Sequence, residues 1–97
     1  LKKKMMNLRL NLKGVWYDMI ESGEKKEEYR EIKSYWTKRL LDDNNNFKNY
    51  ETVTFVYGYT SREITYRCNG IRVGIGNSSW GAPENEVYII SIGDKIE

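Results

Sequence analysis

Hydrophobic and polar residues alternate strictly over Asn7–Leu12, near the start of the chain. A period of two is typical of a half-buried strand, because successive side chains point to opposite faces of a sheet. The alternation therefore predicts a strand with three inward-pointing leucines: Leu8, Leu10 and Leu12.

The period changes to a helical one after Gly14. Four apolar residues recur at helical spacing: Val15, Trp16, Met19 and Ile20. Gly23 follows at a position where glycine commonly ends a helix. We predict a helix of about two turns whose apolar stripe packs on the core.

A second helical pattern covers Ser34–Leu41, and we expect Ser34 to be its N-cap. The residues expected to pack inward from this helix are Leu40 and either Tyr35 or Trp36. The preceding segment, Glu24–Ile32, has no helical apolar face, so it is predicted as a strand or a loop.

The second half of the chain is rich in β-branched and aromatic residues, which favour strands. Strands are predicted over Thr52–Tyr57, from Ile64 towards Gly76, and over Val87–Ile92. Asn69-Gly70 is either a bulge in one long bent strand or a tight turn. Five or six strands with two short helices predict an α+β fold, mainly β. A small closed or nearly closed barrel is the economical arrangement at this length.

Composition places limits on the function. The chain has 97 residues, which is one domain, and 39% of them are hydrophobic and 31% charged, as in a soluble globular protein. The formal net charge is only +2, far from that of a protein held to nucleic acid mainly by charge. Any contact with nucleic acid is therefore expected in a local cleft, with few phosphates and a shallow salt dependence.

Scarce residue types exclude several classes of site. The chain has one cysteine, Cys68, and no histidine, so an internal disulfide, a zinc site and a Ser-His or Cys-His nucleophile are not expected. We expect neither a metal nor a cofactor. No apolar run approaches the length of a membrane span, and a cytoplasmic location is the default expectation. Residues 1–6 are expected to be a tag remnant or a trimmed end without function.

A dense run of mixed charges follows the first predicted helix, with the spacing Gly23-x-Lys25-x-x-Glu28-x-Arg30. Gly23 ends the helix and lets the backbone approach a ligand, and Lys25 falls in the turn. Glu28 and Arg30 share one face of a strand. This set can offer a cation, a carboxylate acceptor and a forked guanidinium to one small polar ligand. The alternative is a solvated edge strand whose alternating charges discourage aggregation.

The charged run and its context resemble the ASCH family (activating signal cointegrator homology), whose signature is G-x-K-x-x-E-x-R. Four residues match that signature: Gly23, Lys25, Glu28 and Arg30. The order of elements is similar along nearly the whole chain. The resemblance implies a PUA-like β-barrel that binds RNA or a nucleotide in a cleft beside the signature.

Some members of this family are amidohydrolases that deacetylate N4-acetylcytidine with a lysine, a threonine and a glutamate, and others are ribonucleases. Lys25 matches the lysine, whereas Glu28 stands where the threonine would be. Glu84 and Glu86 match the glutamate by order alone. If the chain is an enzyme, Lys25 and Glu28 are the catalytic candidates, with Lys25 as the base. The missing threonine favours binding over catalysis.

Aromatic residues at strand ends and in loops form a second group: Tyr57, Tyr59 and Trp80. Such rings can stack on bases, or they can cap the ends of the barrel core. A third, weaker group of cations could extend a positive rim or be ordinary solvated surface residues: Lys33, Lys38, Arg39 and Lys48. Arg67 and Arg72 lie in predicted strands and could face the cleft.

We therefore predict binding of RNA or a modified nucleoside in a cleft, with Lys25 and Arg30 on phosphate or base oxygens. Glu28 would accept from an exocyclic amine or orient Arg30, and Trp80 or Tyr59 would stack on the base. The alternatives are a small hydrolase and a protein-interaction module whose aromatic loop binds a partner. The oligomeric state is left open.

Overall fold

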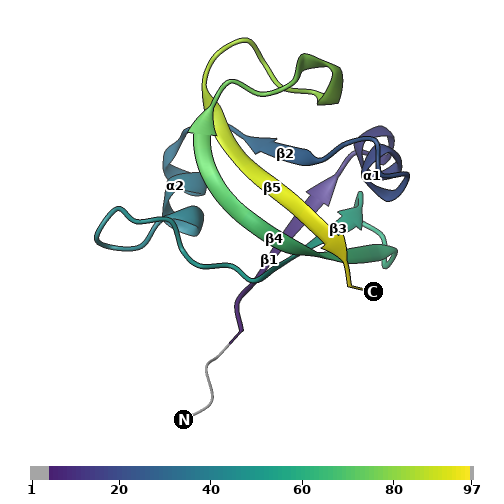
Figure 1. The fold of residues 1–97 in the computed structure, drawn as a ribbon, viewed down its shortest axis with the longest axis horizontal. Coiled ribbons are helices and arrows are strands. Elements are labelled where there is room, and N and C mark those ends of the chain that lie inside the picture. Colours follow the sequence, from purple (N-terminus) through teal and green to yellow (C-terminus); the bar gives the residue numbers. More distant parts are fainter. Residues whose placement is uncertain (1–4, 97) are drawn as a thin grey trace.

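The structure, a computed structural model, describes residues 5–96. Its elements follow one another as β1 (Asn7–Leu12), α1 (Gly14–Glu21), β2 (Glu27–Arg30), α2 (Ser34–Leu40), β3 (Thr52–Tyr57), β4 (Glu63–Gly74), a 3-10 helix (Ser78–Trp80) and β5 (Val87–Lys95). In Figure 1, α1 lies at the right of the strands and α2 at the left. The predicted α+β fold, mainly β, is confirmed.

The five strands form one curled sheet in the order β1-β3-β4-β5-β2. The β1 strand runs parallel to β3, and the other neighbours are antiparallel. The edges of the sheet are therefore β1 and β2. The curl brings them so close that Arg30 of β2 donates a hydrogen bond to the Asn11 carbonyl of β1, at 3.0 Å. The result is a half-barrel with an open seam between β1 and β2, rather than a closed barrel (Figure 1).

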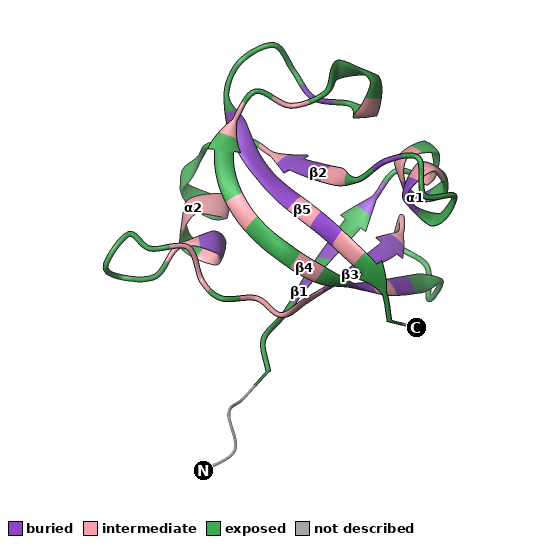
Figure 2. Ribbon diagram, in the orientation of Figure 1, coloured by how far each residue is buried: buried purple, intermediate pink, exposed green. Residues whose placement is uncertain are grey.

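The main core lies inside the curl of the sheet. All three leucines predicted to point inward from β1 are at most 4% exposed, and they pack with apolar residues of β3, β4 and β5. A smaller cluster joins β2 and β5 to the loop between β4 and β5: Tyr29, Ala82, Val87 and Ile89. Figure 2 shows buried residues along β5, whereas much of β4 is exposed. Because β2 is covered on both faces, its two middle residues, Glu28 and Tyr29, are both buried.

The buried stripe of α1 differs from the predicted one. Val15 is 57% exposed, whereas Tyr17 is buried. Tyr17 and Ile20 lie three residues apart on one face of the helix, and Tyr17 packs edge-on against Tyr57 of β3, with ring centroids 5.3 Å apart. The predicted packing of Ile20 and Trp16 on the core is confirmed. Tyr17 was missed because tyrosine was not counted as an apolar position, although its ring can fill a core site.

In α2, the prediction of Ser34 as the N-cap is wrong, whereas the predicted packing of Leu40 on the core is confirmed. The N-cap is Lys33, and no side chain caps the helix, so Ser34 is its first residue. Leu40 is buried as predicted. Of the two aromatic alternatives, Trp36 packs partly on the core and Tyr35 is exposed.

The β4 strand is a single strand of 12 residues. Its register with β5 shifts between Tyr66 and Ile71, and Gly70 within the shift has φ +118°, a conformation that favours glycine. Of the two alternatives at Asn69-Gly70, a bulge or a tight turn, the bulge is therefore right. The bend lets β4 pair mainly with β3 in its first half and with β5 in its second half.

The chain enters β1 beside the segment that leads into β3, where the Glu51 N–H bonds to the Met6 carbonyl at 3.0 Å. Residues 1–4 of the expected tag remnant lie outside the described residues. Within residues 5–96, no helix combines the length and the hydrophobicity needed to cross a membrane.

Candidate ligand-binding groove

The charged run begins at a tight turn between α1 and β2. Gly23 has φ +87°, and its N–H bonds to the Ile20 carbonyl, which ends the helix. The Lys25 N–H then bonds to the Met19 carbonyl at 2.9 Å, so the backbone at Lys25 is fixed beside α1. A Cβ on Gly23 would meet nothing within 4 Å, and Gly23 lines none of the hollows described below. Its visible role is to end the helix.

Lys25 is almost completely enclosed, with 1% of its side chain exposed. Its ammonium lies 3.3 Å from the Glu28 carboxylate and donates to the Trp80 carbonyl. It also faces the rings of Trp16 and Tyr29, at 5.4 and 4.6 Å from their centroids. Burial lowers the pKa of Lys25, and the charge of Glu28 opposes this shift. Because an unpaired buried ammonium costs several kcal/mol, this set of partners is what allows Lys25 to be buried.

Glu28 joins Lys25 to Arg30. One carboxylate oxygen faces Lys25, and the other lies 3.1 Å from an Arg30 nitrogen. The guanidinium of Arg30 also donates to the Asn11 carbonyl across the seam and lies 4.9 Å from the centroid of the Trp36 ring. Burial lowers the pKa of Arg30, and Glu28 opposes this shift. Arg30 thus bridges the seam while 19% of its side chain remains exposed.

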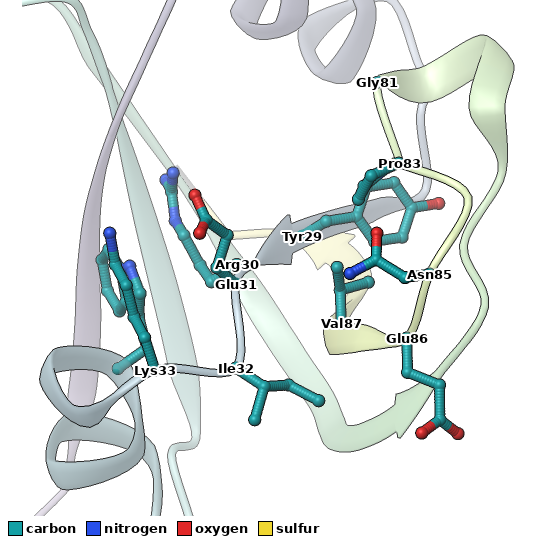
Figure 3. A pocket seen from close by; sticks show the side chains of 11 residues that line it. Tyr29, Arg30, Glu31, Ile32, Lys33, Gly81, Pro83, Asn85, Glu86 and Val87 are labelled. Carbon is teal, nitrogen blue, oxygen red and sulfur yellow. The ribbon is translucent and has the colours of Figure 1, made fainter.

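Three adjoining hollows open along the seam, and Arg30 lines all of them. The inner hollow has a volume of about 250 Å³. Its polar and aromatic lining residues include Lys13, Trp16, Glu28 and Trp80. The loop hollow, about 610 Å³, lies between Tyr29–Lys33 and the loop Gly81–Val87 (Figure 3). The arginine hollow, about 560 Å³, is lined by Arg9, Tyr35, Trp36, Arg39 and Tyr59, among others. We call the three together the seam groove.

The structure brings most of the predicted site residues together. Glu28, Arg30 and Trp80 line the inner hollow, and Lys25 lies directly behind them. Tyr59 lines the arginine hollow and is 96% exposed. The predicted cluster therefore exists, but Lys25 supports the groove from behind instead of facing it.

The remaining predicted residues divide between the groove and the rest of the surface. Lys33 and Arg39 line the seam groove, as does Glu86. Residues that line none of its hollows are Lys38, Lys48, Tyr57, Arg67, Arg72 and Glu84. Arg72 is instead paired with Glu27 at 2.6 Å.

Several groove residues were missed by the sequence prediction: Arg9, Lys13, Trp16, Trp36 and Asn85. One signal was present, because Trp36 and Arg39 lie three residues apart and so share a face of α2. Nothing in the sequence brings Arg9 of β1 next to β2, since these edges meet only through the curl of the sheet. In Figure 3, Asn85 and Pro83 lie on the opposite side of the loop hollow from Arg30 and Lys33.

Tyr29 holds the loop between β4 and β5 against β2. Its hydroxyl donates to Glu27 at 2.8 Å and accepts from the Asn77 N–H at 3.0 Å. Burial is the main cause that raises the pKa of Tyr29 to about 12, and Glu27 adds to it. Burial also raises the pKa of Glu27, but hydrogen bonds from Arg72 and Tyr29 outweigh it and leave that pKa lowered. The network keeps the loop, and with it the Trp80 carbonyl, in place.

Gly81 allows the same loop to reach α1. It has φ +95°, and a Cβ there would lie 2.8 Å from the Trp16 ring. Only glycine satisfies both the left-handed backbone and the close approach. Gly81, and not Gly23, is therefore the glycine at which the backbone comes closest to the groove.

The whole seam groove is lined by five cationic, six aromatic and three acidic side chains. The cations are Arg9, Lys13, Arg30, Lys33 and Arg39. All three tryptophans of the chain lie among the aromatic residues. One of the three carboxylates, Glu28, is buried and already paired with two cations. The groove therefore offers positive charge and aromatic faces to a ligand.

No protein-family model, curated protein or solved structure matches this chain. The resemblance to the ASCH family accordingly stays a prediction based on its four signature residues.

Proposed function

We propose that this chain binds single-stranded RNA, or a nucleotide, in the seam groove. The observation that carries the proposal is the lining of the groove, where four further cations and six aromatic rings surround Arg30. Proteins that bind single strands combine a positive groove with rings on which bases stack, and bases of single-stranded RNA are free to leave their own stack. The small net charge, +2, agrees with contacts to few phosphates.

The roles within the signature change with this geometry. Glu28 orients Arg30, because its two oxygens face Lys25 and Arg30. Arg30 and the cations beyond it contact the ligand. Lys25 has a supporting role, since its ammonium is enclosed by Glu28, the Trp80 carbonyl and two rings.

The test is binding of a fluorescently labelled, mixed-sequence RNA of eight nucleotides, followed by anisotropy and by tryptophan fluorescence. We expect a dissociation constant of about 10⁻⁶ to 10⁻⁴ M at physiological salt. Tryptophan emission should change on binding, because all three tryptophans line the groove. An anisotropy that does not rise with protein up to millimolar concentration would refute the proposal.

A matched pair of lysines shows where the RNA binds. Lys33 lines the loop hollow, whereas Lys95, also exposed, lies at the end of β5. Lys33→Gln should weaken binding several-fold and reduce the slope of log affinity against log salt by about 0.7. Lys95→Gln should change neither quantity. Equal effects of the two variants would place the RNA outside the groove.

The hydrolase alternative gains no support from the position of Lys25. A general base must reach the proton that it removes, and the ammonium of Lys25 is buried behind Glu28 and Trp80. We expect chromatography to show N4-acetylcytidine unchanged after incubation with the protein. Deacetylation that is lost in Lys25→Ala, with the variant still folded, would overturn this expectation.

A further inference from the structure

The arginine hollow differs in chemistry from the other two parts of the seam groove. Three arginines line it, Arg9, Arg30 and Arg39, and none of its lining residues among the described part of the chain is acidic. The loop hollow, by contrast, is lined by both Glu31 and Glu86. The positive charge of the groove is therefore concentrated at one end.

Two of these guanidiniums are held in place by the edge of β1. Arg30 donates to the Asn11 carbonyl at 3.0 Å, and Arg39 donates to the Arg9 carbonyl at 3.3 Å. These carbonyls are two strand residues apart, which is about 7 Å and comparable with the distance between neighbouring phosphates of a polynucleotide. The arrangement fixes both guanidiniums beside the open hollow before any ligand arrives.

Aromatic rings hold the same two guanidiniums from another side. The central carbons of Arg30 and Arg39 lie 4.9 and 5.3 Å from the centroid of the Trp36 ring. Arg39 also lies 5.9 Å from the Tyr35 ring. Stacking of this kind restrains the planar group without using its in-plane N–H donors. At Arg30 one terminal nitrogen already serves Asn11 and Glu28 and the Nε is buried, so the other terminal nitrogen is the one left for a ligand.

The carboxylates nearby do not balance this charge. Arg30 shares Glu28 with Lys25, and Arg9 is paired with Glu63. Within residues 5–96, Arg39 belongs to none of the ion pairs. Burial lowers the pKa of Arg30, and the charge of Arg39 lowers it further against the effect of Glu28. An anion between Arg30 and Arg39 would relieve this repulsion.

We propose that Arg30 and Arg39 form a phosphate clamp, which takes a phosphate monoester or diester of the bound ligand. The inference rests on the proposed function, since it names the part of the nucleotide that this end of the groove takes. Forked guanidiniums suit phosphate because two parallel N–H donors can meet two of its oxygens. Exposed Tyr59, in the same hollow, is placed to stack on the adjoining base.

The clamp can be tested without RNA, by titrating inorganic phosphate at constant ionic strength and following the Trp36 indole N–H by NMR. We expect a saturable shift of this signal. The shift should be lost in Arg39→Gln and retained in Arg67→Gln, a control in which an exposed arginine outside the groove is changed. Arg39→Lys, which keeps the charge but loses the fork, should weaken the response in part.

A second arm compares uridine with uridine 5′-monophosphate. The monophosphate should bind at least about tenfold more tightly, a difference near 1.4 kcal/mol, and Arg39→Gln should remove this preference. If RNA binds but neither phosphate nor Arg39→Gln has an effect, the clamp is refuted and the proposed function stands. If phosphate shifts the Trp36 signal and RNA does not bind, the clamp stands and the proposed function fails. No response to phosphate, nucleotide or RNA refutes both.

Discussion

Lys25 and Arg39 lie on either side of the same Glu28–Arg30 pair, and each has two aromatic rings close to its charge. The surroundings of the two cations nevertheless differ. Lys25 is 1% exposed and is held by a carboxylate, a carbonyl and ring faces, whereas Arg39 is only half-buried and has no carboxylate partner within residues 5–96. A cation that is enclosed by its partners supports the fold, whereas a half-buried cation without a carboxylate partner in the described part of the chain is available to a ligand.

The largest effect expected from this contrast is on stability. Lys25→Met should lower the free energy of unfolding by about 3–5 kcal/mol, because it leaves Glu28 as a buried charge with one cation fewer. Arg39→Gln should lower it by less than about 1 kcal/mol, as for most half-exposed positions. Urea denaturation of both variants measures the difference.

The double variant Lys25→Met/Glu28→Gln is the control for that result. It removes the buried negative charge that has lost one of its two cations, and keeps an amide oxygen that can accept from Arg30, so it should recover part of the lost stability. If Lys25→Met and Arg39→Gln cost the same, the two cations do not differ in role.

The glycines on the two sides of the groove give a second, smaller contrast. Gly23 and Gly81 both have positive φ, but a Cβ would meet only open space at Gly23 and the Trp16 ring at Gly81. Gly23→Ala should cost about 1 kcal/mol for the backbone alone. Gly81→Ala should cost about 1–2 kcal/mol more, because Trp16 must move.

Urea denaturation measures the free energy of unfolding of both glycine variants. The RNA affinity of the folded variants then tests whether each glycine also affects ligand binding. Displacement of Trp16 reshapes the inner hollow, so Gly81→Ala should weaken RNA binding, whereas Gly23→Ala should leave it unchanged. Weaker binding in Gly23→Ala at unchanged stability would restore the predicted ligand contact at Gly23.

Tyr29 belongs to the enclosed surroundings of Lys25, because its ring covers the Lys25 ammonium. Its pKa is raised to about 12 in the folded chain, whereas an unfolded tyrosine ionises near pH 10. Between these values the unfolded state binds fewer protons, so the free energy of unfolding falls as pH rises. By pH 11 the native chain should lose about 1 kcal/mol that Tyr29→Phe does not lose. Equal losses from pH 9 to pH 11 in the two proteins would show that Tyr29 ionises normally.

The parts of the molecule that were predictable from sequence are those set by local periodicity. The alternating leucines of β1 follow from side-chain direction alone. Glycine conformation located the irregularity at Asn69-Gly70, although it did not choose between a bulge and a tight turn. The cluster of Lys25, Glu28 and Arg30 could also be predicted, because these residues are close in sequence. Its burial could not, since Trp80 and the loop that carries it cover Lys25 from 55 residues away.

The outer end of the groove was missed for a related reason. The helical pattern of α2 predicts Trp36 as a core residue and Arg39 as a surface cation. They become one site only when the curl of the sheet brings the edge of β1 beside β2 and α2. The approach of two distant sheet edges depends on the whole sheet, and no local pattern encodes it.

The smallest effect on stability is expected at Tyr59, which is 96% exposed. Tyr59→Ala should change the free energy of unfolding by less than about 0.5 kcal/mol. If its ring stacks on a base beside the clamp, the same change should weaken RNA binding by about 1 kcal/mol or more, roughly fivefold. Tyr59→Phe keeps a ring face and should bind as the native chain does. Loss of affinity in both variants would assign the effect to the hydroxyl instead of to stacking, and loss in neither would confine the bases to the inner and loop hollows.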